Sequence, residues 1–94
     1  MRLNGIIWLP HIVDKLEAKH GVREYEVEEI LASSPRFLFV ERGNVKGEDL
    51  YSAVGQTQAG RYLIVYFLRK SSGKALIVSS RNLTPREKRI YAKK

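Results

Sequence analysis

Three residues of this sequence carry side chains that could transfer a proton or bind an anion: His20, Arg81 and Tyr91. A histidine, with an unperturbed pKa of about 6.5, can transfer protons at neutral pH. An arginine guanidinium can bind a phosphate through two parallel hydrogen bonds. A tyrosine phenol can donate a proton or offer its ring for base stacking. The spacing of the three along the chain does not by itself unite them in one site.

Each of these residues also has a structural interpretation. His20 stands in the last turn of an expected helix, where an imidazolium complements the helix C-terminus. Arg81 ends an apolar strand and could pair with an acid of the expected second helix. Arg86 and Arg89 follow it on the expected last helix and favour the phosphate-binding role. Tyr91 could simply pack with its hydroxyl outward, so both interpretations stay open here.

The basic residues are concentrated in the second half of the chain, which continues through Lys93 and Lys94. Residues 1–49 contain seven Lys or Arg against nine Asp or Glu, whereas residues 50–94 contain ten against one. The net charge is +7. Such segregation predicts one positive and one weakly acidic face. A positive face attracts phosphate backbones, although a basic surface can also serve solubility alone.

The composition argues against several classes of protein. Cysteine is absent and the two histidines are far apart, so no disulfide framework and no metal-ligand set is expected. No phosphate-cradling glycine loop, nucleophile elbow or cofactor fingerprint is present, so no cofactor is expected. The first residues lack the apolar core of a signal peptide. The longest apolar run, 62–68, is far below the about 20 residues of a membrane span. We therefore expect a cytoplasmic protein without membrane contact.

Apolar periodicity and chain breakers define the elements that must position these side chains. Gly21 is placed to end the first helix, and the apolar run within 61–68 is typical of a central strand covered on both faces. Thr84, Pro85 and Glu87 form the start of a capped helix, with Glu87 completing a capping box. Strands are expected at 6–9, 36–42, 50–56, 61–68 and 74–80, and helices at 11–20, 24–32 and from 85 onward.

The order of these elements, β-α-α-β-β-β-β-α, predicts the fold class. We expect one α+β domain over residues 1–94, because a chain of 94 residues has room for a single core. Two N-terminal helices would pack on a mainly antiparallel sheet of four or five strands, and a basic helix would close the domain.

Four groups of residues along the chain resemble a known family. Together they resemble the BrnT-like toxins of bacterial type II toxin–antitoxin systems, which are related to the RelE superfamily of compact ribonucleases. The motifs cover nearly the whole chain in the expected order. They are Ile7-Trp8-Leu9; Lys19-His20-Gly21-Val22; Gly47-Glu48, Ala53-Val54-Gly55 and Gly60-Arg61; and Ile77-Val78-Ser79-Ser80-Arg81 followed by Thr84-Pro85-Arg86-Glu87-Lys88-Arg89 and Tyr91.

The resemblance implies a RelE-like fold and a metal-independent endoribonuclease, in which a ribose 2′-hydroxyl attacks the neighbouring phosphate. It further implies RNA as substrate, a cognate antitoxin protein that covers the basic face, and a homodimer or a toxin–antitoxin hetero-oligomer as the assembly. For that chemistry the sequence offers His20, Arg81 and Tyr91 as candidate catalytic residues and Lys19, Arg61, Arg86 and Arg89 as candidate RNA-binding residues.

The sequence departs from the family pattern at two places. Leu9-Pro10 follows Trp8 where the family usually has an aspartate, and Leu50-Tyr51 stand where many members carry an arginine after the Gly-Glu pair. Both positions lie where polar site residues are expected. An inactive RNA- or protein-binding domain of the same fold is therefore the alternative function.

Overall fold

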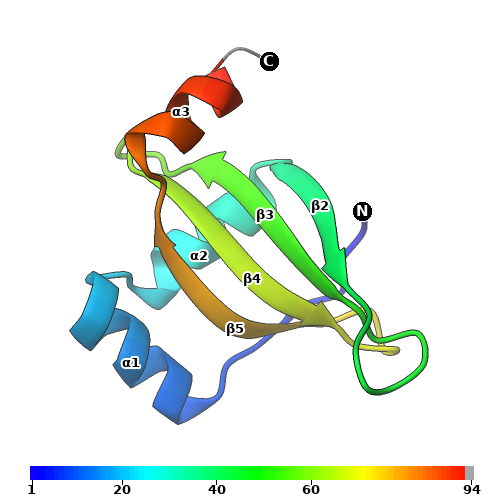
Figure 1. The fold of residues 1–94 in the computed structure, drawn as a ribbon. Coiled ribbons are helices and arrows are strands. Elements are labelled where there is room, and N and C mark those ends of the chain that lie inside the picture. Colours follow the sequence, from blue (N-terminus) through cyan, green and yellow to red (C-terminus); the bar gives the residue numbers. More distant parts are fainter. Residues whose placement is uncertain (93–94) are drawn as a thin grey trace.

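A computed structural model describes residues 1–92; Lys93 and Lys94 of the predicted basic segment lie outside the described residues. The elements follow one another in the predicted order (Figure 1). Within residues 1–92 no helix is long and apolar enough to cross a membrane. The elements are β1 (Ile6–Ile7), α1 (Pro10–His20), α2 (Glu24–Ala32), β2 (Arg36–Glu41), β3 (Leu50–Gln56), β4 (Tyr62–Arg69), β5 (Ala75–Asn82) and α3 (Pro85–Ala92).

The strands form one mixed sheet in the order β1-β5-β4-β3-β2. Neighbours among β2, β3, β4 and β5 are antiparallel, as predicted. β1 differs from the expectation, because it has two residues instead of four and lies parallel to β5. It is short because Pro10 begins α1 rather than ending a strand, and proline suits the first helical turn, where its missing N–H is not needed.

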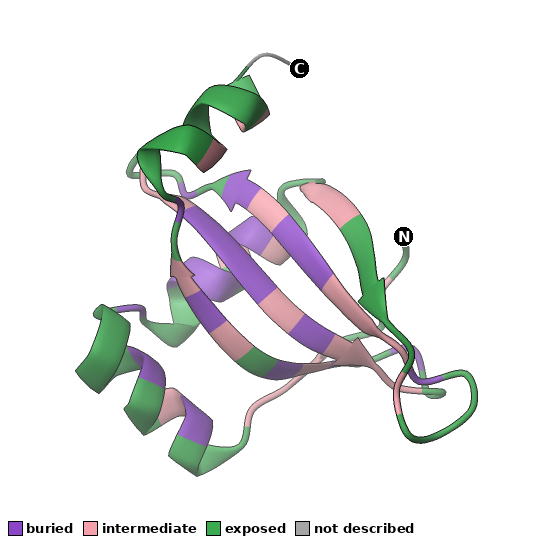
Figure 2. Cartoon of the chain, in the orientation of Figure 1, coloured by how far each residue is buried: buried purple, intermediate pink, exposed green. Residues whose placement is uncertain are grey.

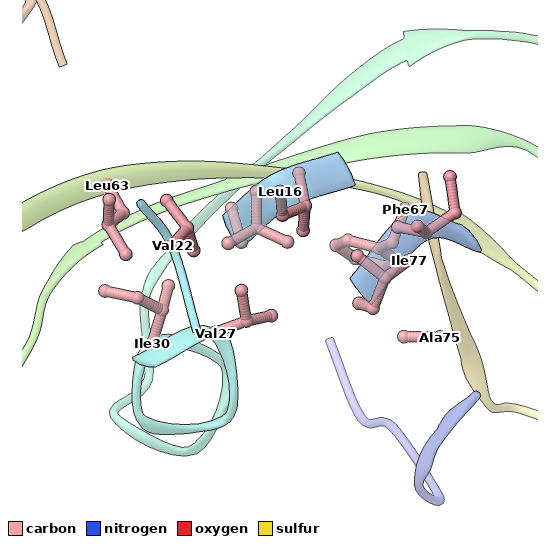
Figure 3. Close-up of a cluster of buried hydrophobic side chains, with 11 residues drawn as sticks. Leu16, Val22, Val27, Ile30, Leu63, Phe67, Ala75 and Ile77 are labelled. Atoms are coloured by element: carbon pink, nitrogen blue, oxygen red, sulfur yellow. The ribbon is translucent and has the colours of Figure 1, made fainter. Parts of the chain in front are cut away.

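α1 and α2 pack on one side of the sheet, which we call the helix face. Alternate residues of each strand point to this side, and Leu63, Val65 and Phe67 of β4 are completely buried there. Figure 3 shows Leu63 and Phe67 among apolar side chains of the two helices. Each large apolar side chain buried in this way stabilises the fold by about 1.5–3 kcal/mol. The core consists of Ile12, Leu16, Val22, Val27, Ile30, Ala53, Leu63, Val65, Phe67, Ala75 and Ile77.

Two helix ends confirm predictions made from local sequence. Gly21 ends α1 in the left-handed conformation (φ 60°) and donates its N–H to the carbonyl of Glu17 at 3.0 Å. Before α3, the Thr84 hydroxyl accepts from the Glu87 N–H at 3.1 Å, and the Thr84 N–H donates to Glu87 Oε1 at 2.8 Å. This capping box fixes where α3 begins and where its first turn points.

The opposite side of the sheet, which we call the open face, is covered by α3 at one end only (Figures 1 and 2). The prediction that the strand within 61–68 is covered on both faces is wrong for its second half. Ile64 is buried, whereas Tyr66 and Leu68 are only half-buried. The reason is length: α3 has eight residues and spans about 12 Å, which is too short to follow β4 to its end.

Candidate nucleic-acid interface

The register of the sheet places two arginines in one row across the open face. Arg36 pairs with Val54, Val54 with Ile64, and Ile64 with Arg81. We call these four residues the arginine row. With strands about 4.8 Å apart, the two arginine Cα atoms are separated by roughly 14 Å. The row therefore presents a cation at each end of a short apolar floor.

A second row of side chains carries hydroxyl groups. Ser52 of β3 pairs with Tyr66 of β4, and Tyr66 with Ser79 of β5. These three residues, the hydroxyl row, lie on the open face one step along the strands from the arginine row, because every second residue shares a face. The phenol of Tyr66 lies close enough to Arg81 to help raise the pKa of its guanidinium. The hydroxyl groups of Tyr66 and Ser79 and the Arg81 guanidinium thus lie half-buried on the open face, whereas Ser52 is buried.

Arg81 forms a two-point ion pair with Glu87 of α3. Nη1 donates to Oε1 at 2.8 Å and Nη2 to Oε2 at 3.1 Å, while Nη1 also donates to the Asn82 carbonyl at 3.1 Å. The hydrogen bonds to Glu87 are the main cause that raises the pKa of Arg81, and Tyr66 adds to it. The predicted ion pair with an acid of the second helix is thus wrong in its partner, which lies in the last helix.

We expect the ion pair to make the free energy of unfolding depend on pH in the acidic range. The hydrogen bonds from Arg81, followed by that from the Thr84 N–H, lower the pKa of Glu87 to about 2. A lowered carboxyl pKa stabilises the fold above the unfolded-state value of 4.5, and this contribution is lost as the pH falls toward 2. Both side chains are 34% exposed, so solvent screening leaves about 1 kcal/mol.

Urea denaturation of the protein and of Glu87→Gln between pH 7 and pH 2.5 measures this contribution. Glutamine still accepts the capping hydrogen bond but has no charge. The variant is expected to be about 1 kcal/mol less stable at pH 7, and the difference should shrink below pH 4.5. A difference that is constant with pH would contradict the assignment.

Aromatic rings and cations meet where α3 approaches the sheet. The rings of Tyr62 and Tyr91 stand edge to face with centroids 5.9 Å apart. The Arg36 guanidinium lies 5.1 Å from the Tyr91 centroid, and Lys88 Nζ lies 5.5 Å from the Tyr62 centroid. Such cation–π contacts hold the rings in place. Cations beside aromatic faces are also the groups that bind single-stranded nucleic acids.

His20 and Lys19 belong to the helix layer of the molecule, and Arg81 belongs to the opposite face of the sheet. Both are exposed at the end of α1, which packs on the helix face, whereas Arg81 is on the open face. The structure therefore does not bring His20 together with Arg81 and Tyr91. The roles of His20 in proton transfer and of Lys19 in RNA binding stay predictions.

Arg61 is held by protein groups on the helix side of the molecule. Its Nη1 donates to the Gly21 carbonyl at 2.8 Å and to Glu26 Oε1 at 2.9 Å, and its Nη2 donates to the His20 carbonyl at 2.8 Å. Nε donates to Asn82 Oδ1 at 2.7 Å. These contacts join the end of α1 to α2 and β5. They give Arg61 a structural role that its place in the sequence did not indicate.

The charges of α2 and α3 lie on opposite sides of the sheet. α2 carries Glu24, Glu26, Glu28 and Glu29 with no basic residue, and it covers the helix face. α3 carries Arg86, Lys88 and Arg89, which are exposed beside the open face. The open face and α3 therefore form the basic side of the molecule. Arg86 and Arg89 are accessible for the RNA contacts predicted for them.

Glu48 lies at the end of the sheet far from Arg81. It is buried and accepts from Lys70 Nζ at 2.7 Å and from the Ser71 N–H at 2.9 Å, and these bonds lower its pKa. Glu48 thus joins the β2–β3 loop to the β4–β5 turn. Among the described residues, no three His, Asp or Glu side chains converge on a position that could hold a metal ion.

Sequence reasoning missed Arg36, Tyr66 and Glu87 as site residues. Arg36 lies beside Tyr91, and Tyr66 lies beside Arg81. Both positions depend on the register of four strands, which local patterns do not fix. Glu87 was recognised as a cap but not as the partner of Arg81. The alternation of side chains along the strands was the available signal, since it places Tyr66 on the same face as Ile64.

Among the comparisons with known proteins, only the one with solved structures bears on the fold. No protein-family model and no curated protein sequence matches the chain. The crystal structure of the Brucella abortus ribonuclease toxin BrnT superposes with a TM-score of 0.63 at 22% sequence identity. The similarity covers 85% of this chain and 96% of that protein. The chain therefore has the BrnT-like toxin fold that its motifs predict.

Proposed function

We propose that the chain is the toxin of a type II toxin–antitoxin system and cleaves RNA on the open face of its sheet. The observation that carries the proposal is the position of Arg81, which lies beside the hydroxyl row on a basic face of a fold shared with a ribonuclease toxin. A guanidinium and phenols are groups that bind and protonate phosphate oxygens.

The proposed reaction is an internal transfer at phosphorus. The ribose 2′-oxygen bonds to the adjacent phosphorus and gives its proton to a solvent water, and the bond from phosphorus to the 5′-oxygen breaks. A phenol of Tyr66 or Tyr91 gives its proton to the departing 5′-oxygen. Arg81 stabilises the negative charge that develops on the phosphorane. The products carry a 2′,3′-cyclic phosphate and a 5′-hydroxyl, and no metal takes part.

Arg81 has donors left for a phosphate while it is bound to Glu87. A guanidinium has five N–H donors, and three are used by Glu87 and the Asn82 carbonyl. Neither group uses the Nε proton or the second Nη2 proton, and Tyr66 is the neighbouring side chain with which a phosphate would share them. Glu87 therefore positions Arg81 without occupying all of its donors.

The partners proposed for the chain follow from its charge. RNA would bind the open face and α3, where Arg86 and Arg89 are exposed. A cognate antitoxin protein would inhibit the toxin by covering the same basic surface in the cytoplasm. The active toxin would then be released from a hetero-oligomer, and sedimentation of the isolated chain would show whether it is a monomer or a homodimer.

One observation favours the alternative, an inactive domain that binds RNA or protein. Glu87 is the single acid in residues 50–94, and its low pKa makes it a weak base. Residues 50 and 51 also lack the arginine that many family members have. The open face is therefore richer in cations and phenols than in proton acceptors, which suits binding as well as cleavage.

Incubation of the purified chain with end-labelled RNA, with and without EDTA, separates the two functions. We expect cleavage that EDTA does not prevent, with 5′-hydroxyl products, and growth arrest when the chain is expressed. Salt-sensitive RNA binding without products would support the inactive binder. Loss of cleavage in EDTA would contradict the metal-independent mechanism.

A further inference from the structure

A pocket of about 170 Å³ lies between α3 and the open face. Val54 and Ile64, the middle of the arginine row, form its floor, and Ile90 and Tyr91 of α3 form its roof. Arg36 and Glu87 are the polar residues of its lining. Ile90 is 54% exposed, so the rim of the pocket is open to solvent.

The size and lining of the pocket suit a single planar ring. An apolar protein cavity of about 150 Å³ holds one benzene molecule, and this pocket is of similar size. The ring of Tyr91 supplies an aromatic surface, with Arg36 already in contact with its face at 5.1 Å. Stacking on an aromatic ring and contact with a guanidinium are the ways in which proteins hold unpaired bases.

The carboxylate of Glu87, which lines the pocket, has one further hydrogen-bond position. Oε1 accepts from Arg81 and from the Thr84 N–H, whereas Oε2 accepts from Arg81 alone. Each carboxylate oxygen can accept about two hydrogen bonds, so Oε2 has one position left for an N–H donor. The pairing edges of cytosine and uracil carry such donors, in an amino group and an imino group respectively.

We propose that this pocket binds the pyrimidine base of the nucleotide whose phosphate is held by Arg81, and thereby sets the sequence preference of cleavage. The effect of the pocket on the sequence preference of cleavage rests on the proposed function. The charge of the site, as well as its shape, indicates which ligand binds. Arg36 lines the pocket beside Val54, and Arg81 is the strand neighbour of Ile64 just outside it, which suits a ligand with a flat apolar ring and an attached phosphate.

Titration of the isotope-labelled protein with mononucleotides, followed by amide NMR shifts, tests the pocket without requiring cleavage. Cytidine and uridine monophosphates should shift the amides of Val54 and Ile90 and bind about tenfold more tightly than ribose 5-phosphate. Guanosine monophosphate should bind more weakly than both pyrimidine nucleotides. Equal binding of purine and pyrimidine nucleotides, or of ribose 5-phosphate, would overturn the inference.

Ile90→Trp should fill the pocket from its roof, and the variant should fold because Ile90 is largely exposed. Its affinity for pyrimidine nucleotides should fall about tenfold, to that of ribose 5-phosphate. Val45→Trp is the matched control, since Val45 is 58% exposed and lies in the β2–β3 loop. Unchanged nucleotide affinity in Ile90→Trp, or an equal loss in Val45→Trp, would overturn the inference.

Mapping of cleavage sites separates this inference from the proposed function. If the protein cuts beside pyrimidines and Ile90→Trp loses that preference, both are supported. If it cuts RNA but Ile90→Trp keeps the same preference, the pocket inference fails while the ribonuclease stands. If no RNA is cut but pyrimidine nucleotides bind selectively in the pocket, the ribonuclease fails and the base-binding site stands.

Discussion

Arg81→Ala is expected to lower kcat/KM for RNA cleavage by about 10²–10³-fold, the usual effect of removing a group that stabilises charge in the transition state. The fold should survive, because the ion pair with Glu87 is partly exposed and contributes about 1 kcal/mol. The rate with end-labelled RNA measures the effect, and expression of the variant should no longer arrest growth. Circular dichroism and urea denaturation of the same preparation verify that the variant is folded.

Two further variants show whether the effect belongs to the guanidinium at this position. Arg81→Lys keeps the charge but not the two-point geometry, so its rate should lie between those of the protein and Arg81→Ala. Arg42→Ala removes the same charge from an exposed position just after β2, at the other end of the sheet. An equal loss of activity in Arg42→Ala would show that net charge, rather than a site at Arg81, governs cleavage.

The parts of the fold that depend on local sequence could be predicted. Gly21 ends α1 because the left-handed conformation is readily available to glycine. Thr84 and Glu87 begin α3 through a reciprocal pair of hydrogen bonds that needs a spacing of three residues. Apolar runs and turn residues likewise located the strands from Arg36 to Asn82 within a residue or two. Each of these signals is carried by residues close together in the chain.

The candidate site could be predicted only in part, because it depends on contacts between distant segments. Arg81 and Tyr91 were identified by residue type and by resemblance, and both lie beside the open face. Arg36 reaches this site only because β2, β3, β4 and β5 pair in one particular register. A shift by one residue would move Arg36 to the helix face, and no local pattern excludes that shift.

Arg61 is a second residue whose role depends on contacts with distant segments. Its motif predicted RNA binding, whereas its contacts are structural. We expect Arg61→Ala to lower the free energy of unfolding by about 3 kcal/mol. The substitution removes the N–H donors that bind the Gly21 and His20 carbonyls at the end of α1. It also leaves the Glu26 carboxylate, which is 12% exposed, without its cation. In a domain whose total stability is about 5–15 kcal/mol, urea denaturation would resolve this change readily.

Lys19→Ala is the matched control for Arg61→Ala. It removes one positive charge from the end of α1 that Arg61 contacts. Because the Lys19 side chain is exposed, the free energy of unfolding should change by less than about 0.5 kcal/mol. A double-mutant cycle with Glu26→Gln isolates the ion pair, and the loss in the double variant should be smaller than the sum of the two single losses.

The two roles of Arg61 predict different combinations of stability and affinity. If Arg61 is structural, Arg61→Ala should bind RNA with nearly unchanged affinity at temperatures where it is folded, because its donors already bind the Gly21 and His20 carbonyls. If instead RNA affinity falls while the free energy of unfolding is unchanged, Arg61 contacts RNA directly. The RNA surface would then extend from the open face around the end of the sheet to His20 and Lys19. That outcome would give His20 a place in the site after all.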